Sequence, residues 1–354
     1  MKALVRILVI LATSAAAVWF INRSSGEAPF STPSGPQLVT STQRSMGAEA
    51  RFTAWTSDAK AARAAFNDAF RELERLESLM SVWRPDSDIV KLNDAAGKQP
   101  VTVSQEVFDA LRAAREFGDT TSGAFDVTFG ALADIWKFDH DQDNKIPSPA
   151  DIQQRLPLVG YKDLIVDASA RTAYLTRAGM RAHLGGIGKG FAVDRVASIL
   201  KERGITNFMI QFGGDMYVAG MPGNRQWRVG IQDPRGSGNK SFAAMELTDS
   251  AVSTSGDYER FFLKDGVRYH HIMDPRTGQP ARGSRSVTIV ANTSTMADAL
   301  STGVFVMGPA DGMALVERLP DVEGVIVSDR NEVLVSSGLK ARLAILSPPT
   351  DATP

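Results

Sequence analysis

The stretch from Asn207 to Ala291 constrains the fold more than any other, because it holds a series of strand-like segments separated by turn signals. Within each segment, apolar residues alternate with polar ones or form a short run, and Gly, Pro, Asn and Asp cluster between segments. The segments are NFMIQFGGDMYVAG, QWRVGIQDP, SFAAMELT, ERFFLKDGVRYHHI and SRSVTIVA. No strict alternation of strand and helix accompanies them, so the sequence predicts largely antiparallel sheets.

Helices are predicted on both sides of this stretch. Residues 58–80 place Ala65, Leu73 and other apolar residues at helical intervals. A second helix is predicted from Ser104, whose hydroxyl suits an N-cap, to Phe117. Further helices are predicted at 192–204 and 295–308, and hairpins at 162–176 and 322–339. The fold class is therefore predicted to be α+β with helices packed on the sheets, and neither the Rossmann nor the P-loop glycine fingerprint follows a strand.

Composition excludes several classes of site. The chain has 354 residues, 43% of them hydrophobic, which is enough for a substantial core in the soluble globular class. It contains no cysteine, so disulfides, thiolate nucleophiles, thiolate metal sites and a lipid on an N-terminal cysteine are excluded. The formal net charge is −1 and no basic stripe is present, so nucleic acid is not expected as a partner.

The N-terminal region differs from the rest of the chain. Lys2 and Arg6 precede an apolar run from Ile7 to Ile21, a pattern typical of an export signal. Residues 1–22 are therefore predicted to be an export signal or an uncleaved N-terminal membrane anchor, and both alternatives stay open. We expect a periplasmic location, with a tether to the inner membrane if the segment is retained. Residues 23–42 are predicted to be a flexible linker, 43–346 the folded catalytic domain and 347–354 a disordered tail.

The segment HLGGIGKGFAVD, from His183 to Asp194, holds four glycines between a predicted strand and a predicted helix. Glycine lets backbone amides approach a ligand closely, and a helix N-terminus favours anions. Lys189 adds a positive charge beside them. The segment predicts a phosphate or diphosphate cradle; the alternative is a tight strand-to-helix connection.

Asp298 and Thr302 lie four residues apart on a predicted helix, so their side chains share one face. That face otherwise points into the core, where an uncompensated carboxylate is costly. A carboxylate with a hydroxyl suits Mg²⁺, which prefers oxygen ligands and substrate phosphates. The alternative is an aspartate that bonds neighbouring backbone amides.

Two histidines, His270 and His271, end a predicted strand. Successive side chains of a strand point to opposite faces, so the pair is not expected to chelate one ion. His271 lies where the strand opens into the loop DPRTG, a position where functional residues concentrate. A structural role and a role as base both stay open for His271.

Two other motifs are weaker. The motif GGD at Gly213–Asp215 is compatible with a plain turn and with a site. Asp126 is compatible with a helix cap and with a ligand contact.

In combination these segments resemble the FAD:protein FMN transferases, the ApbE-type flavin transferases. The matching motifs appear in the family's order over roughly residues 40–345: STQRSMGAEA, SVWRPDSDIVKLN, SGAFDVTFGAL, HLGGIGKGFAVD, FGGDMYVAG, VSTSGDYERFF, RYHHIMDPRTGQP and ADALSTGVFVMG. The resemblance implies an α+β fold with a T-fold-like core. It also implies Mg²⁺-dependent transfer of FMN from FAD to a Thr or Ser hydroxyl, with release of AMP. The implied acceptors are redox proteins or membrane electron-transfer subunits.

The resemblance also implies roles for individual residues. His271 would act as acceptor-side base or orienter, and Asp298 as the catalytic carboxylate. Mg²⁺ would be held by Asp298, Thr302 and the carbonyl of Gly188, where the family usually has alanine. The implied contacts to FAD are Met46, Trp83 (where tyrosine is frequent), Ala124, Phe125, Asp126, Gly185, Lys189, Phe191, Asp194 and Ile272. The alternative functions are an FAD pyrophosphatase that yields FMN and AMP, and a non-catalytic periplasmic flavin-binding protein.

Overall fold

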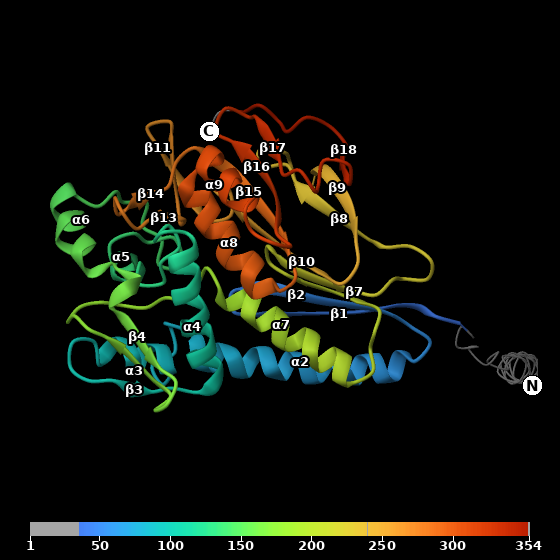
Figure 1. The fold of residues 1–354 in the computed structure, drawn as a ribbon, viewed down its shortest axis with the longest axis horizontal. Coiled ribbons are helices and arrows are strands. Elements are labelled where there is room, and N and C mark those ends of the chain that lie inside the picture. The colour runs from blue at the N-terminus through green and yellow to red at the C-terminus, as the bar shows by residue number, and fades with distance from the viewer. Residues whose placement is uncertain (1–34, 239, 353–354) are drawn as a thin grey trace, which may run out of the picture.

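The computed structural model describes residues 35–238 and 240–352 (Figure 1). Its centre is an eight-stranded sheet in which all neighbouring strands run antiparallel. The predicted α+β class with largely antiparallel sheets is therefore confirmed. In spatial order the strands are β1 (Gln37–Ser45), β2 (Ala48–Thr56), β6 (Phe208–Phe212), β7 (Asp215–Ala219), β10 (Ser250–Gly256), β15 (Ser284–Ala291), β16 (Glu323–Ser328) and β17 (Val333–Val335).

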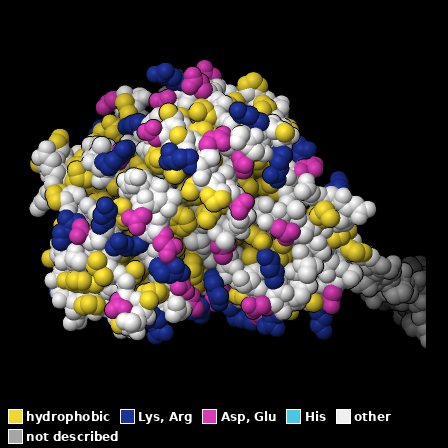
Figure 2. Space-filling view, viewed as in Figure 1, with side chains coloured by type: hydrophobic (Ala, Val, Ile, Leu, Met, Phe, Trp, Pro, Cys, Tyr) yellow, Lys and Arg dark blue, Asp and Glu magenta, His cyan; other side chains and the backbone are white. Residues whose placement is uncertain are grey.

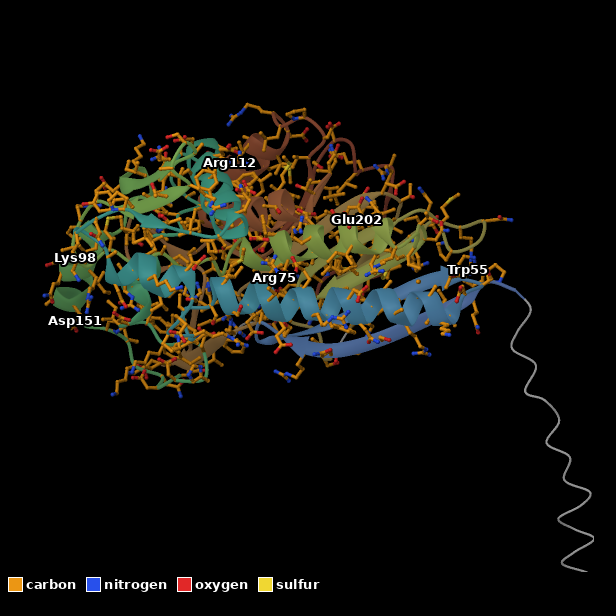
Figure 3. All side chains as sticks on the ribbon, turned by 90° about the horizontal axis from the view of Figure 1, so that it is seen from below. Trp55, Arg75, Lys98, Arg112, Asp151 and Glu202 are labelled. Atoms are coloured by element: carbon orange, nitrogen blue, oxygen red, sulfur yellow. The ribbon has the colours of Figure 1, made fainter. Side chains whose placement is uncertain are left out.

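Four helices pack on one face of this sheet: α2 (Ala59–Met80), α7 (Gly188–Glu202), α8 (Ser294–Met307) and α9 (Pro309–Val316). The predicted helices at 58–80, 192–204 and 295–308 are thus confirmed, although α7 begins earlier than expected. Helices α2 and α7 run side by side, as Figures 1 and 3 both show. Small buried residues of α2, such as Ala62 and Ala69, allow this close approach.

The opposite face of the large sheet is covered by three strands: β8 (Trp227–Gln232), β9 (Ser241–Leu247) and β18 (Leu343–Ile345). Side chains of β10 alternate between the two layers, because successive residues of a strand face opposite sides. Ala251 joins the core under the helices, whereas Val252 joins the core between the sheets. With both faces covered, β15 is buried along its whole length.

A smaller lobe precedes α7 in the chain. It contains α3 (Asp88–Asp94), α4 (Gln105–Thr120), α5 (Gly130–Ala133), α6 (Pro149–Arg155), the 3₁₀ turns Leu156–Leu158 and Tyr161–Asp163, and a small sheet of β3 (Val101–Thr102), β4 (Leu164–Asp167) and β5 (Thr172–Leu175). The predicted helix from Ser104 is confirmed as α4, and the Ser104 hydroxyl accepts a hydrogen bond from the Val107 amide. The predicted hairpin at 162–176 is confirmed as β4 and β5.

An aromatic cluster attaches the hairpin of β11 (Phe261–Lys264) and β12 (Val267–His270) to this lobe. The Trp136 ring stacks 5.9 Å from Tyr269, and Tyr269 stacks 5.3 Å from Phe262. The Trp136 indole also donates a hydrogen bond to the Gly278 carbonyl, next to the short pair of β13 (Met273–Asp274) and β14 (Gln279–Pro280). The cluster therefore fixes the chain segments on either side of His271.

The predicted boundaries at the chain ends need correction. The expected signal or anchor at 1–22 lies outside the described residues, as does most of the expected linker at 23–42. Residues 37–42 are not linker, because they form β1, in which Val39 is buried and Thr40 bonds Thr53 across the strand pair. The abundance of Ser and Thr, which suggested a linker, is equally compatible with a strand at a sheet edge.

The expected disordered tail is also corrected where it is described, at 347–352. The Thr350 amide and hydroxyl both donate to the buried carboxylate of Asp233, the hydroxyl at 2.6 Å. The Asn331 side chain donates to the Pro349 carbonyl. These contacts hold the segment against the sheets.

Charges of both signs are mixed over the molecular face shown in Figure 2, without a surface of a single sign. Of the helices in the described part of the chain, none has the length and apolar composition needed to cross a bilayer.

Candidate functional site

The start of α7 and the first half of α8 touch at Gly190. A Cβ atom placed on Gly190 would lie 2.2 Å from the Ser294 carbonyl oxygen and 2.7 Å from the Asp298 Cβ, so only glycine fits there. The Gly190 amide donates a hydrogen bond of 2.9 Å to Asp298 Oδ2. The structure thus brings together the glycine-rich turn and the carboxylate, which the sequence suggested as separate parts of a site.

Thr302 lies one turn further along α8, under the same glycine-rich turn. A Cβ on Gly186 would lie 3.3 Å from Thr302 Oγ1. The Thr302 hydroxyl is also 3.2 Å from the Ser255 hydroxyl, which comes from β10. A Cβ on Gly188 would meet nothing closer than 3.6 Å, so the alanine usual in the resembling family would fit at this position.

Lys189 lies between two carboxylates, one of which the sequence did not identify as part of a site. Its ammonium group forms a hydrogen-bonded ion pair with Asp215 and lies 3.9 Å from Asp298 Oδ1. Asp215 is fully buried and accepts a further hydrogen bond of 2.7 Å from the Ser253 hydroxyl. The signal for Asp215 was the motif GGD, which on its own is equally typical of a turn.

Burial controls the ionisation of this cluster. Burial is the main cause that raises the pKa of Asp298, and the negative charge of Asp215 adds to it, while Lys189 and the Gly190 amide oppose the rise; together they bring this pKa to about 7. For Lys189, burial disfavours the charged form, but the charges of Asp215 and Asp298 outweigh it and raise the pKa above its ordinary value. Two carboxylates therefore compete for one ammonium group, and the cluster favours an additional cation.

His271 follows β12 and lies close enough to Lys189 for its charge to act on the imidazole. Its Nδ1 lies 3.3 Å from the Arg260 carbonyl oxygen, and Arg260 itself pairs with Asp139. Burial holds the pKa of His271 well below its ordinary value, and the positive charges of Arg260 and Lys189 lower it further. At neutral pH His271 is consequently a neutral imidazole.

His270 faces the interior instead, which agrees with the expectation of opposite faces. Its Nε2 lies 2.9 Å from the Ala281 carbonyl oxygen, and its ring meets Phe305 of α8 edge-on at 5.5 Å. Burial lowers its pKa to about 4. His270 is therefore packed in the core, where its ring is held by Phe305 and the Ala281 carbonyl.

Met46 and Trp83, both expected at the flavin, occupy different surroundings. Met46 lies in the turn between β1 and β2, with its amide bonded to the Glu77 carboxylate at 2.9 Å. Its Cε is 3.9 Å from a Cβ placed on Gly188, so Met46 reaches the glycine-rich turn. Trp83 is 54% exposed and packs edge-on against His140 at 4.4 Å. Its indole face is therefore available to a ligand at the surface.

The carboxylates of Asp126 and Asp194 are both occupied within the protein. Asp126 accepts from the amide and hydroxyl of Thr128 and from the Tyr161 amide. Asp194, on α7, accepts from the amides of Ser294 and Thr295 at the start of α8. Burial raises the pKa of each carboxyl, and these hydrogen bonds oppose the rise. Both carboxylates thus have hydrogen-bond partners within the protein, and their expected contact with FAD stays a prediction.

Of the remaining expected contacts, Phe125, Gly185 and Phe191 lie at the glycine-rich turn, whereas Ala124 and Ile272 are buried. Phe125 would touch a Cβ on Gly186 at 3.1 Å, and the Gly185 amide bonds His183 Nδ1 at 3.0 Å. Phe191 packs on the core from the first turn of α7. Ala124 and Ile272 are 5% exposed each, so they offer little surface to a ligand in this conformation.

A cavity of about 290 Å³ lies further along α8, beyond Phe125. Ala124, Met307, Arg276 and Arg318 are among its lining residues, but Asp298 and His271 are not. Among the described residues no group of three or more His, Asp or Glu side chains is arranged to hold a metal ion. A cation at Asp298 would therefore need hydroxyl, carbonyl or substrate oxygens as further ligands.

Comparison with known proteins gives a consistent result. Residues 46–326 match the sequence model of the ApbE family. The chain is 34% identical over 298 residues to the FAD:protein FMN transferase of Treponema pallidum, covering 80% of this chain and 82% of that protein. It is 30% identical over 313 residues to the FAD:protein FMN transferase of Escherichia coli K12, covering 87% and 89%.

Solved structures agree with the sequence relatives. The ApbE protein of Thermotoga maritima superposes with a TM-score of 0.80 at 34% identity, covering 86% of this chain and 99% of that one. The flavin transferase ApbE of Vibrio cholerae gives 0.78 at 28% identity, covering 87% and 99%.

Proposed function

The chain belongs to the ApbE family of flavin transferases, and from that premise we propose that it transfers the FMN moiety of FAD to a threonine or serine hydroxyl of an acceptor protein, with Mg²⁺ required and AMP released. The observation that supports this most is that the glycine-rich turn meets Asp298 at Gly190 and Thr302 at Gly186, beside Lys189. Such a site holds both anion-binding and cation-binding groups, which a diphosphate with its counter-ion requires.

The diphosphate of FAD would bind at the start of α7. The N-cap residue Ile187 makes no side-chain hydrogen bond to this helix; the Gly190 amide donates to Asp298, and the Gly188 amide donates to the Leu184 carbonyl. The positive end of the helix dipole would attract the phosphates. Lys189 adds a positive charge next to them. Backbone amides and an ammonium group held in place stabilise the charge that develops on phosphate oxygens during transfer.

The residues around Asp298 fit Mg²⁺ by the chemistry of their donors. A carboxylate, the Thr302 hydroxyl and the Gly188 carbonyl are hard oxygen ligands. The carboxylate also lies beside the proposed diphosphate, where two anions would repel each other without a cation. When bound, Mg²⁺ supplies this charge neutralisation for the diphosphate and for the departing AMP phosphate.

His271 would accept the proton of the acceptor hydroxyl. Its Nδ1 is within reach of the Arg260 carbonyl oxygen, which favours the tautomer with the proton on Nδ1 and leaves Nε2 free to accept. The acceptor oxygen then forms a bond to the FMN phosphorus as the bond from that phosphorus to the oxygen of AMP breaks. Met46, Trp83 and the Phe125 region are proposed to contact the flavin nucleotide.

We further propose that the enzyme works in the periplasm, exported by the signal or anchor expected at 1–22. The acceptor would be a redox protein or a membrane electron-transfer subunit that exposes its hydroxyl in the same compartment. The basic start and apolar run of the N-terminal region support this location.

The deciding experiment incubates the protein with FAD, Mg²⁺ and a candidate acceptor domain. Covalent fluorescent flavin on the acceptor is expected. Free FMN and AMP alone would indicate a pyrophosphatase, and unchanged FAD would indicate a binding protein without catalysis.

Two variants test the roles of individual residues. Asp298→Ala should abolish turnover while retaining some FAD binding, and His271→Ala should slow transfer by on the order of 10²-fold. Full activity of Asp298→Ala would contradict the metal role, and comparable losses from His270→Ala would contradict the assignment of the base.

A further inference from the structure

Asp215 is a buried carboxylate to which the resemblance assigns no role. It is the first residue of β7 and pairs with Phe212 on β6 and Ser253 on β10, so its backbone is fixed in the middle of the large sheet. One oxygen of its side chain accepts from the Ser253 hydroxyl at 2.7 Å, and the other pairs with the Lys189 ammonium. Its carboxylate therefore has a defined position and one charged partner.

Lys189 is shared between Asp215 and Asp298. Its Nζ contacts Asp215 directly and lies 3.9 Å from Asp298 Oδ1. Asp298 Oδ2 is already engaged by the Gly190 amide, so Oδ1 is the oxygen that remains for a cation. An ammonium group that moved fully onto Oδ1 would occupy the place that the proposed function gives to Mg²⁺.

We propose that Asp215 is a positioning residue that holds the Lys189 ammonium away from Asp298, and so keeps Asp298 open to Mg²⁺. The inference rests on the proposed function. In the described part of the chain, Asp215 and Asp298 are the only carboxylates within ion-pair distance of Lys189. If Asp215 is neutralised, Asp298 becomes the remaining counter-charge for a buried ammonium group, and the lysine then competes with the metal.

A purely structural ion pair would make a different prediction. A buried pair can often be replaced by neutral groups without loss of fold, and its removal then has no reason to change metal affinity. The position of the pair within 4 Å of Asp298 is what connects it to the cation site. The matched comparison is Asp233, which is equally buried, pairs with Lys240 and bonds Thr350 on the other side of the sheet.

The test is the affinity for Mg²⁺ itself, measured by titration calorimetry without FAD on the wild type, Asp215→Asn and Asp233→Asn. Asp215→Asn should weaken binding roughly 10-fold or more, a size typical of residues that support metal ligands, whereas Asp233→Asn should leave it unchanged. An Asp215→Asn variant with wild-type affinity overturns the proposal. The titration is repeated with ADP, which supplies diphosphate oxygens as further ligands. If the wild type binds no Mg²⁺ in either titration, the metal dependence of the proposed function fails instead.

The double variant Asp215→Asn with Lys189→Met separates positioning from other roles. Removal of the competing ammonium group should restore most of the Mg²⁺ affinity, because Asp298 is then unpaired. A double variant as weak as Asp215→Asn overturns the proposal, since Asp215 would then act on the metal without Lys189. If Asp215→Asn does not fold, Ser253→Ala loosens the same carboxylate, and an unchanged Mg²⁺ affinity in that variant is equally decisive against the proposal.

Discussion

At the level of single residues, His270 and His271 show that neighbouring identical side chains can have different surroundings, although burial lowers the pKa of both. One imidazole is packed against Phe305 and bonded to a carbonyl oxygen in the core. The other lies near Arg260 and senses the charge of Lys189. The direction in which the strand ends decides which of them packs in the core and which is proposed to meet the substrate.

His270 makes the stability of the protein depend on pH. Burial is the main cause that lowers its pKa to about 4, and Arg282 and Arg268 lower it further, against the attraction of Asp257. The unfolded chain takes up the proton near the ordinary pKa of about 6.5. The free energy of unfolding that this residue contributes is therefore fully present above about pH 6.5 and falls as the pH drops toward 4.

The expected size follows from the same pKa difference. Between about pH 7.5 and about pH 5, the wild type should lose about 2 kcal/mol more stability than His270→Gln, whose amide can still donate to Ala281. Urea unfolding at the two pH values measures the difference, and the contributions of His183 and His271 cancel between the two proteins. Equal pH dependence of both proteins would show that His270 is not buried as described.

The candidate site was predictable from sequence at the residues that carry unusual chemistry. Asp298 with Thr302, the glycine-rich turn and His271 were found because charge on an apolar helix face and clustered glycine are rare. Asp215 was missed, because its motif reads as a turn and its partner Lys189 is distant in the sequence. Whether a carboxylate is buried depends on tertiary packing, and the local sequence around Asp215 does not show that packing.

At the level of elements, α7 and α8 are joined by the Asp194 carboxylate. It accepts from the Ser294 and Thr295 amides and from the Thr295 hydroxyl at 2.6 Å. The first amides of a helix lack partners within the helix, so a carboxylate supplied by another helix stabilises its start. The distance between Gly188 and Asp298 thus depends on Asp194.

Asp194→Ala should lower the free energy of unfolding by about 1–3 kcal/mol, because buried amides lose their acceptor. It should also weaken Mg²⁺ binding, since α8 is free to shift against α7. Denaturant unfolding and metal titration measure the two effects. Glu202→Ala, an exposed carboxylate at the other end of α7 (Figure 3), is the control and should change neither.

The elements with strong periodicity were predicted best. Helices α2, α4 and α8 follow from their apolar spacing, and α4 also from its N-cap. The start of α7 was placed too late, because Gly188 and Gly190 are poor helix formers in isolation. Close packing against α8 outweighs that preference. This packing depends on the tertiary structure, so the local sequence does not predict it.

At the level of the whole molecule, the strand order was not predictable from the sequence. Strands β8 and β9 follow β7 in the chain, yet they leave the large sheet and cover its other face, so that β7 pairs with β10. Alternation of apolar residues shows that each strand is half-buried or buried, but it does not determine which strands pair with each other. Only the general class, antiparallel sheets with helices, followed from the order of elements.

The C-terminal segment contributes to this layered arrangement. Deletion of residues 347–354 removes two sets of hydrogen bonds. Thr350 no longer donates to the Asp233 carboxylate, and Asn331 loses the Pro349 carbonyl as its acceptor. The free energy of unfolding should fall by about 1–3 kcal/mol, since these polar groups lose their partners. Flavin transfer below the unfolding transition should stay the same, because the segment does not contact Asp298 or His271.

Thermal unfolding of the full chain, of the deletion variant and of Thr350→Ala measures this contribution, with an intermediate loss expected for the point variant. Deletion of residues 353–354 alone is the control. A deletion variant as stable as the full chain would show that the segment is not attached to the sheets.

The site is made from the meeting of α7 and α8, whose key residues lie more than a hundred positions apart in the chain. No short fragment can therefore assemble it. A polypeptide still emerging from the ribosome lacks the complete site until α8 has been synthesised and has docked against α7.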